Sequence, residues 1–155
     1  MSNTIVLALD GTEQSPGPVR YAKEIAHDRD ANVVVVHVKE LIAGRAAGPL
    51  HTDEDVRIAS VRSQVADLRA AGIAAELRTS STLRNPATAI AAAARRAGAD
   101  LIVVGGTTHG ALTGALAGST PQSLLHTSPC PVLVAPAREV AVAANRDAAR
   151  TPVAA

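Results

Sequence analysis

The sequence predicts an α/β fold: a doubly wound, Rossmann-like parallel sheet of five strands in the order 3-2-1-4-5, with helices on both faces. The first observation is a set of short apolar runs that are continuous rather than alternating, as is typical of parallel strands buried on both faces. The second is the helical spacing of apolar residues between successive runs. This alternation of strands and helices requires right-handed crossovers and a mainly parallel sheet.

The first half of the chain carries two predicted strands and two predicted helices. Ile5–Leu9 and Val33–Val38 are apolar runs, and the helix Pro18–Arg29 between them has its apolar residues on one face. The next helix, Asp53–Ala71, repeats apolar residues at spacings of three and four, and Gly72 stands where a helix C′ glycine belongs.

The second half continues the same alternation. The run Ile73–Ser80 alternates in polarity, which predicts a more exposed strand near a sheet edge. An Asn-Pro pair caps the helix Ala87–Ala97, and Gly98 ends it. Leu101–Val104 is the fourth strand, and Ser119–Thr127 is a helix that a Ser-Pro pair stops.

Residues 1–137 are expected to form one domain, which closes with the strand Val132–Val134. The segment Leu41–His51 is rich in Gly, Ala and Pro and is long enough to be a lid or a mobile segment. Residues 138–155 form an Ala-rich tail that we expect to be flexible.

Composition argues against nucleic acid as a partner. The chain has one Tyr and no Phe or Trp, so it lacks the aromatic platforms on which single strands stack. A formal net charge of +1 does not provide the excess of positive charge that is typical of nucleic-acid-binding proteins. The hydrophobic fraction of 47% nevertheless permits a full core.

The sequence predicts a soluble cytoplasmic protein with no membrane partner. Cys130 is the only cysteine, so no disulfide can form within the chain. The start, "MSNTIVLALD", lacks a basic n-region, and no apolar run approaches the length that spans a bilayer.

A ligand site is predicted where strand order reverses, between the first and fourth strands. The first strand is followed by Asp10-Gly11-Thr12 and the fourth by Gly105-Gly106. A carboxylate and a glycine-rich segment, "VVGGTTHGALTGALAGST", would thus face the same crevice.

Each part of this crevice has a natural role toward a nucleotide. Asp10 can accept hydrogen bonds from ribose hydroxyls, and Gly105 lets the backbone come close to a ligand. Gly118 and Ser119 would present free N–H groups at a helix N-terminus, where anions are favoured. Val38 would place backbone polar groups beside an adenine edge.

Purely structural interpretations compete with these roles. The segment Asp10-Gly11-Thr12 can be a strand-ending turn only. "STPQ", from Ser119 to Gln122, matches a capping box.

Other chemistries find little support in the sequence. His37 lies inside an apolar strand and is interpreted as a packed core residue. His109 can touch a phosphate, although a surface role is the preferred interpretation. His27, His51 and His126 show no metal-ligand spacing, and no metal site is predicted. There is no defensible Ser-His-Asp order, no paired carboxylates, no P-loop motif and no G-x-G-x-x-G after the first strand, so no catalytic residue is predicted.

The chain resembles the universal stress protein family over about Thr4 to Pro136. The resemblance rests on "IVLALDGTEQS", "VVVVHV", "NPATAIAAAARRAGADLIVVGG" and "HTSPCPVLVAP". It implies the fold given above, usually as a dimer joined through the last strand.

The family's ATP-binding signature, G-x2-G-x9-G-[ST], is matched with one change. Here it reads Gly105-x2-Thr108-x9-Gly118-Ser119, with Thr in place of the second glycine. A β-branched residue holds positive φ poorly and would narrow the space for phosphates. Pro121 further removes a hydroxyl and an N–H, and His109 stands alone where the family often has Arg or Lys.

The resemblance implies an adenine-nucleotide site whose adenosine half, at Ala8, Asp10 and Val38, is intact. The full set of implied nucleotide-binding residues is Ala8, Asp10, Thr12, Val38, Gly105, Thr108, His109, Gly118, Ser119 and Thr120. The implied ligand is ATP, or AMP or ADP, with Mg²⁺ as an accompanying ion. The implied partner is a second copy of the chain, paired through Val132–Val134.

Three functions follow from these residues. The leading hypothesis is a regulatory or protective stress-response protein that binds adenine nucleotide and is not an efficient enzyme, any ATP hydrolysis being slow and incidental. The second is a universal stress protein dimer that binds no nucleotide and acts through protein interaction. The third is an adenylating nucleotide hydrolase, which "DGTEQS" disfavours because it lacks the S-G-G-x-D-S loop.

Overall fold

The computed structural model describes residues 3–12, 16–41, 51–106 and 119–136. The predicted tail and most of the predicted lid lie outside the described residues. The elements are β1 (Thr4–Ala8), α1 (Pro16–Arg29), β2 (Asn32–Glu40), α2 (His51–Ala70), β3 (Ala75–Thr82), α3 (Pro86–Ala97), β4 (Leu101–Gly105), α4 (Ser119–Thr127) and β5 (Val132–Ala135).

The strands form one parallel sheet in the order β3-β2-β1-β4-β5, as predicted. β1 lies at the centre, where Ala8 pairs with Val36 of β2 on one side and with Val104 of β4 on the other. β3 and β5 are the two edges. The alternating polarity of β3 is therefore explained by its place, because an edge strand needs no continuous apolar run.

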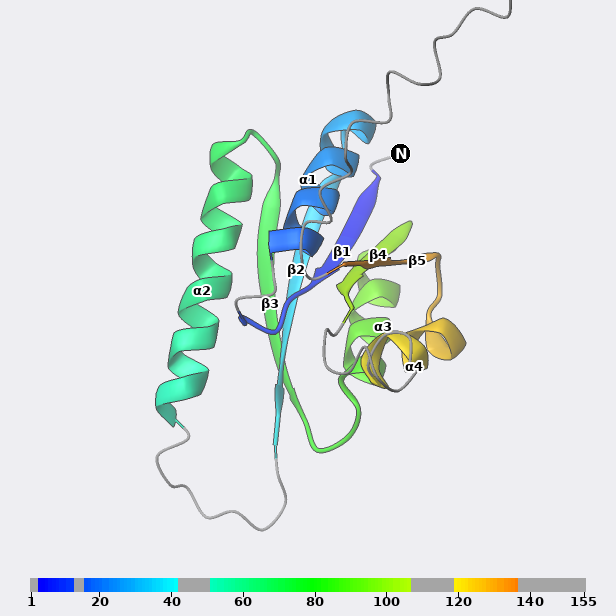
Figure 1. Cartoon of the computed structure of the whole chain (residues 1–155). Coiled ribbons are helices and arrows are strands. Elements are labelled where there is room, and N and C mark those ends of the chain that lie inside the picture. Colours follow the sequence, from blue (N-terminus) through cyan, green and yellow to red (C-terminus); the bar gives the residue numbers. More distant parts are fainter. Residues whose placement is uncertain (1–2, 13–15, 42–50, 107–118, 137–155) are drawn as a thin grey trace, which may run out of the picture.

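Helices lie on both faces of the sheet (Figure 1), and an apolar cluster on each face holds them there. On one face α1 and α2 cover Leu7, Val35 and Val103. On the other, α3 and α4 cover Val6 and Ile102. The small side chains of α3, among them Ala87, Ala91 and Ala94, are buried, which lets this helix lie close to the strands.

Helix ends follow the predicted caps. Asn85 is the N-cap of α3, where its side chain accepts from the N–H of Ala87, and Gly98 adopts the left-handed conformation at the C-cap. β3 begins at Ala75 rather than at Ile73. The N–H of Ile73 instead donates to the Leu68 carbonyl and closes the end of α2, so Ile73 belongs to a helix cap.

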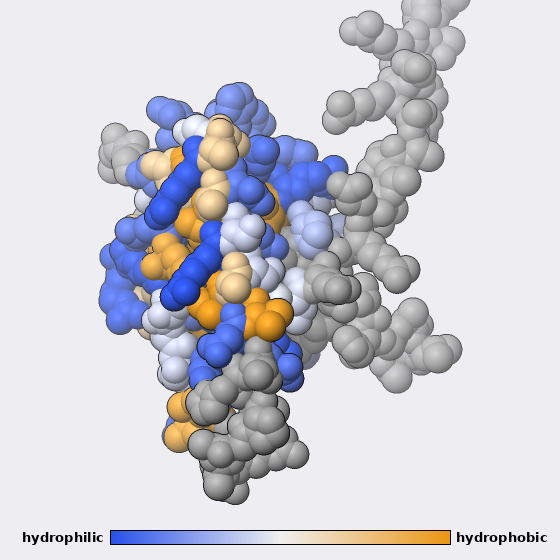
Figure 2. All heavy atoms as spheres, turned by 90° about the vertical axis from the view of Figure 1, so that its left-hand side faces the viewer, coloured by the Kyte–Doolittle hydropathy of each residue, from blue (hydrophilic) through white to orange (hydrophobic). Residues whose placement is uncertain are grey.

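Other boundaries differ by one or two residues. β2 extends past its apolar run because Lys39 and Glu40 continue the pairing with Ser81 and Thr82 of β3. On the face that α2 covers, hydrophilic side chains surround apolar ones that lie toward its centre and lower part (Figure 2). Within the described ranges, no helix has the length and apolarity needed to cross a membrane.

Candidate functional site

The carboxyl ends of β1 and β4 meet at the reversal of strand order, as the sequence predicts. Because Ala8 pairs with Val104, the segments that follow them leave the sheet side by side. Asp10 is two residues beyond Ala8, and Gly105 is one residue beyond Val104. The predicted carboxylate and the first glycine of the loop are therefore brought to one edge of the sheet.

Asp10 closes a tight turn at this edge. Its Oδ1 accepts a 2.9 Å hydrogen bond from the N–H of Thr12 and a 2.8 Å bond from the Thr12 hydroxyl. The interpretation as a strand-ending turn is thus correct. The turn uses only one oxygen of the carboxylate. Oδ2 has no hydrogen-bond partner in the described part of the chain, and the side chain is exposed.

Gly11 presses this turn against α2. Its φ of +74° is left-handed, and a Cβ added there would lie 2.7 Å from the Cα of Arg57 and closer still to the Arg57 carbonyl oxygen. Only glycine meets both demands. The turn that carries Asp10 is therefore fixed by contact with α2, at a residue more than 40 positions further along the sequence.

Gly105 has a packing role of its own. A Cβ at this position would lie 3.1 Å from Cγ of Pro18 in α1, tighter than ordinary contact. The next residue, Gly106, donates a 2.8 Å hydrogen bond to the Ala135 carbonyl and so ties the start of the loop to β5. A side chain at Gly105 would therefore crowd Pro18, so the packing of α1 favours glycine here independently of any ligand.

Ala8 and Val38 point to the opposite face from α2. Both belong to the apolar cluster beneath α3 and α4, in which Ala8 is buried and Val38 is partly buried. The same cluster contains Leu124 of α4, the helix that Ser119 begins. The structure thus brings the two predicted adenosine contacts and α4 to one face of the sheet.

The phosphate half of the predicted site is only partly described. Thr108, His109 and Gly118 lie outside the described residues. Ser119 is the first residue of α4, and Thr120 is half-buried beside the buried Pro121. Proline is compatible with the first turn of a helix, where backbone N–H groups have no partner within the helix.

Sequence reasoning missed an ion pair behind the site. His37 is a core residue, as predicted, with 3% of its surface exposed. Its Nδ1 lies 2.9 Å from the Leu9 carbonyl oxygen, and its Nε2 lies 2.8 Å from Oε1 of Glu54. A histidine in an apolar strand signals that partners must exist, because buried polar groups are hydrogen-bonded. The identity of a partner on α2 could not be read from spacing.

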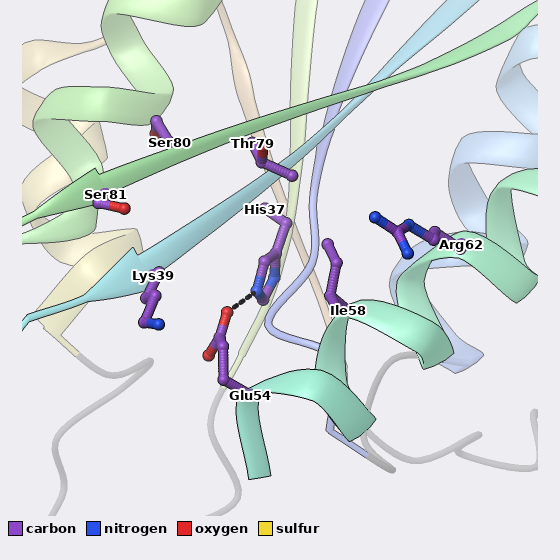
Figure 3. A pocket seen from close by; sticks show the side chains of 8 residues that line it. All are labelled: His37, Lys39, Glu54, Ile58, Arg62, Thr79, Ser80 and Ser81. Atoms are coloured by element: carbon purple, nitrogen blue, oxygen red, sulfur yellow. Dashed lines mark hydrogen bonds and ion pairs between the residues drawn. The ribbon is translucent and has the colours of Figure 1, made fainter. Parts of the chain in front are cut away.

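A hollow of about 310 Å³ opens beside this pair (Figure 3). It is lined by polar residues of β2, β3 and α2, among them Lys39, Arg62 and Thr79. Lys39 and Thr79 flank His37 in the strand pairing and face α2 with it. The hollow is therefore on the other side of the sheet from Val38 and is not the predicted adenine pocket.

Two further features of the described residues bear on chemistry. Cys130 is half-buried ahead of β5, and burial raises the pKa of its thiol. In the part of the chain that the structure describes, no three His, Cys, Asp or Glu side chains are grouped to hold a metal ion.

Known proteins resemble this chain over most of its length. A sequence model of the Universal stress protein family matches residues 1–136. A protein of Thermus aquaticus described as "Universal stress protein in QAH/OAS sulfhydrylase 3'region" is 32% identical over 136 residues, which are 86% of this chain and 98% of that protein.

Solved structures share the fold. The universal stress protein from Archaeoglobus fulgidus in complex with dAMP has a TM-score of 0.63 and 23% identity, covering 86% of this chain and 97% of its own. A universal stress protein in complex with cAMP has a TM-score of 0.64 and 23% identity, covering 88% of this chain and 98% of its own. The matched family model and the relative at 32% identity together show that this chain belongs to the universal stress protein family.

Proposed function

We propose that this protein binds an adenine nucleotide where β1 and β4 diverge, and that it acts as a regulatory stress-response protein. The observation that carries the proposal is the Asp10 carboxylate. Oδ1 accepts both hydrogen bonds from Thr12, and Oδ2 is left to accept hydrogen bonds from a ligand. Ribose hydroxyls are suitable donors for an exposed carboxylate oxygen.

The nucleoside half of the site has the stronger support. Val38 is only partly buried and so offers apolar surface, and the buried Ala8 belongs to the same cluster, on the face that α4 also covers. The two solved family members bound to dAMP and cAMP add weight, since both ligands carry adenine. We propose ATP, AMP or ADP as the ligand and Mg²⁺ as its accompanying ion.

The phosphate half decides which nucleotide is preferred. The family signature has glycine where this chain has Thr108. We expect Thr108 to limit contact with a triphosphate more than with a monophosphate, so that AMP competes well with ATP. Replacing Thr108→Gly is then expected to tighten ATP binding about tenfold and AMP binding much less.

Calorimetric titration with AMP and ATP tests the proposal. Asp10→Asn keeps an oxygen for the Thr12 hydrogen bonds but removes the charge, and we expect about tenfold weaker binding. Asp28→Asn, an exposed change at the far end of α1, is the matched control and should bind normally. Absence of heat and of any melting shift at millimolar nucleotide would overturn the proposal in favour of a family member without nucleotide.

We propose that two copies pair through β5. This strand is short and apolar, and among the residues that the structure describes it is paired on one side only, by β4. Light scattering should give twice the mass of one chain, and a mass of one chain would contradict the pairing. We also propose that the protein acts in regulation in the cytoplasm rather than in catalysis.

A further inference from the structure

The hollow between α2 and the strands β2 and β3 has the size of a small-molecule site. Its volume of about 310 Å³ is at the lower end of the range that such sites cover, about 300–1,000 Å³. It lies on the opposite face of the sheet from Val38, so it is separate from the proposed adenine pocket. The side chains that line it indicate which small molecule it suits.

Two cations line the hollow, Lys39 and Arg62, and neither has an ionic or hydrogen-bonded partner in the described part of the chain. Lys39 is half-buried near the end of β2, and Arg62 is exposed on α2. Glu54 is the one carboxylate among the described lining residues, and its Oε1 already lies 2.8 Å from Nε2 of His37. The two cations are therefore available to an anion from outside the chain.

The two cations lie at opposite ends of the hollow. Because α2 connects the parallel strands β2 and β3, it runs back along the sheet, which places Arg62 toward the start of β2 while Lys39 is near its end. Arg62 is eight residues after Glu54, which is about 12 Å of helix rise. Helix side chains lean toward the N-terminus, which directs Arg62 back to the hollow. Figure 3 shows Lys39 and Arg62 on opposite sides of the His37 ring.

The lining between the two charges is partly apolar and partly hydroxylic. Ile58 is four residues before Arg62, so it lies on the same side of α2 and gives the hollow an apolar wall. Thr79 and Ser81 are alternate residues of β3, so their side chains share one face of the sheet. Their hydroxyl groups can donate hydrogen bonds to carboxylate oxygens. The hollow therefore suits a molecule that is apolar in the middle and anionic at both ends.

We propose that this hollow binds a small organic dianion, of which a short linear dicarboxylate is the simplest form. One carboxylate pairs with the Lys39 ammonium. The other accepts two parallel hydrogen bonds from the planar guanidinium of Arg62. The methylene groups between them lie against Ile58. A compact dianion such as inorganic phosphate reaches only one of the two cations at a time. The inference does not depend on nucleotide binding, because the two sites have no lining residue in common.

Calorimetric titration with malonate, succinate, glutarate and adipate, at constant ionic strength, tests the proposal. These dicarboxylates differ only in the number of methylene groups, so two cations at a fixed separation should favour one length over the others. Butyrate has the chain length of succinate with a single carboxylate, and inorganic phosphate is a dianion with a single centre. We expect both to bind at least about tenfold more weakly than the best dicarboxylate.

Substitutions of the two cations assign the binding to the hollow. Lys39→Gln and Arg62→Gln should each raise the Kd of the best dicarboxylate about tenfold, because each removes one of the two charges. Arg62→Lys keeps the charge but loses the planar pair of donors, so it should raise the Kd less. Lys23→Gln is the matched control, since Lys23 is an exposed cation of α1 that does not line the hollow. Its Kd should equal that of the natural protein.

Each outcome decides the inference. Absence of heat with every dicarboxylate at millimolar concentration would overturn it, as would equal affinities for butyrate and the best dicarboxylate. Equal losses in Lys23→Gln and Lys39→Gln would reveal an effect of net charge alone and would also overturn it. Saturating AMP should leave the dicarboxylate Kd unchanged, whereas displacement by AMP would assign the dianion to the nucleotide site instead. A protein that binds the dicarboxylate but no AMP would contradict the proposed function and leave this inference intact.

Discussion

Gly11 lies directly against the backbone of Arg57, although β1 and α2 are separated by a helix and a strand in the sequence. A single added methyl group would meet three backbone or Cβ atoms of Arg57. The seating of α2 and the shape of the turn that carries Asp10 are thus two aspects of one contact. Changes at this contact are expected to reach the proposed nucleotide site and the stability of the fold together.

Gly11→Ala is expected to be more destabilising than the same change at another left-handed glycine. At Gly72 φ is +82° and nothing lies within 4 Å of an added Cβ, so Gly72→Ala should cost only backbone strain, about 1–2 kcal/mol in the free energy of unfolding. Gly11→Ala adds a steric clash with Arg57 to a similar strain. Urea unfolding of both variants measures the difference, and equal losses would show that α2 can shift without penalty.

Leu124 and Leu125 are neighbours on α4 with opposite surroundings, which makes them a matched pair. Leu124 is 0% exposed in the cluster beneath α3 and α4, whereas Leu125 is 65% exposed. Leu124→Ala should lower the free energy of unfolding by about 2–5 kcal/mol through the lost burial and the cavity left behind. Leu125→Ala should change it by less than about 0.5 kcal/mol. A comparable loss from Leu125→Ala would mean that the exposed side chain is covered in solution.

Asn85 stabilises α3 in two ways that substitutions can separate. Its Oδ1 accepts from the N–H of Ala87 at 2.9 Å, and its Nδ2 donates to the Ser123 hydroxyl at 2.8 Å. Ser123→Ala removes only the second bond and should cost about 1 kcal/mol. Asn85→Ala removes both and should cost about 1 kcal/mol more, the contribution of a helix cap. Thermal or urea unfolding checks the order, with the exposed Thr88→Ala as control.

Cys130 should react slowly with thiol reagents near neutral pH. Burial raises the pKa of this thiol, the Ser128 hydrogen bond lowers it less, and the charge of Asp100 raises it slightly. The reactive species is the thiolate, so the rate with iodoacetamide should reach its half-maximum at a higher pH in the folded protein than in the unfolded chain. A lower half-maximum in the folded state would contradict this prediction.

The same shift sets the sign of a stability effect. The folded pKa lies above the unfolded value of about 8.5, so the stabilisation is complete below that pH and is lost as the pH rises through the folded pKa. Cys130→Ser removes this contribution. Above about pH 8.5 the urea midpoint of the natural protein should therefore fall relative to that of Cys130→Ser.

The fold was predictable because its signals are local. Continuous apolar runs such as Val33–Val38 occur only where both faces of a strand are buried, and the caps at Asn85 and Gly98 mark helix ends through chemistry contained within a few residues. Ile73 was misplaced for a related reason. An apolar residue after a C′ glycine fits a strand and a helix cap equally well, and only the hydrogen bond to Leu68 separates them.

The candidate site was predictable only in outline. The rule on strand reversal places Asp10 and Gly105 at one edge, because it depends on topology alone. The packing of Gly105 on Pro18 and the bridge from His37 to Glu54 depend on how helices sit over the sheet. Side-chain contacts between elements far apart in sequence leave no periodic trace, so these features required the structure.

The two edges of the sheet differ in a way that limits assembly. β3 carries the exposed charges of Glu76 and Arg78, which form an ion pair along the strand itself, whereas β5 is apolar. Charged side chains on an edge strand oppose the addition of another chain. A dimer joined at β5 would present only its β3 edges outward, so assembly would stop at two copies. A raised concentration of this protein would then increase the fraction of dimer and would not produce a fibre.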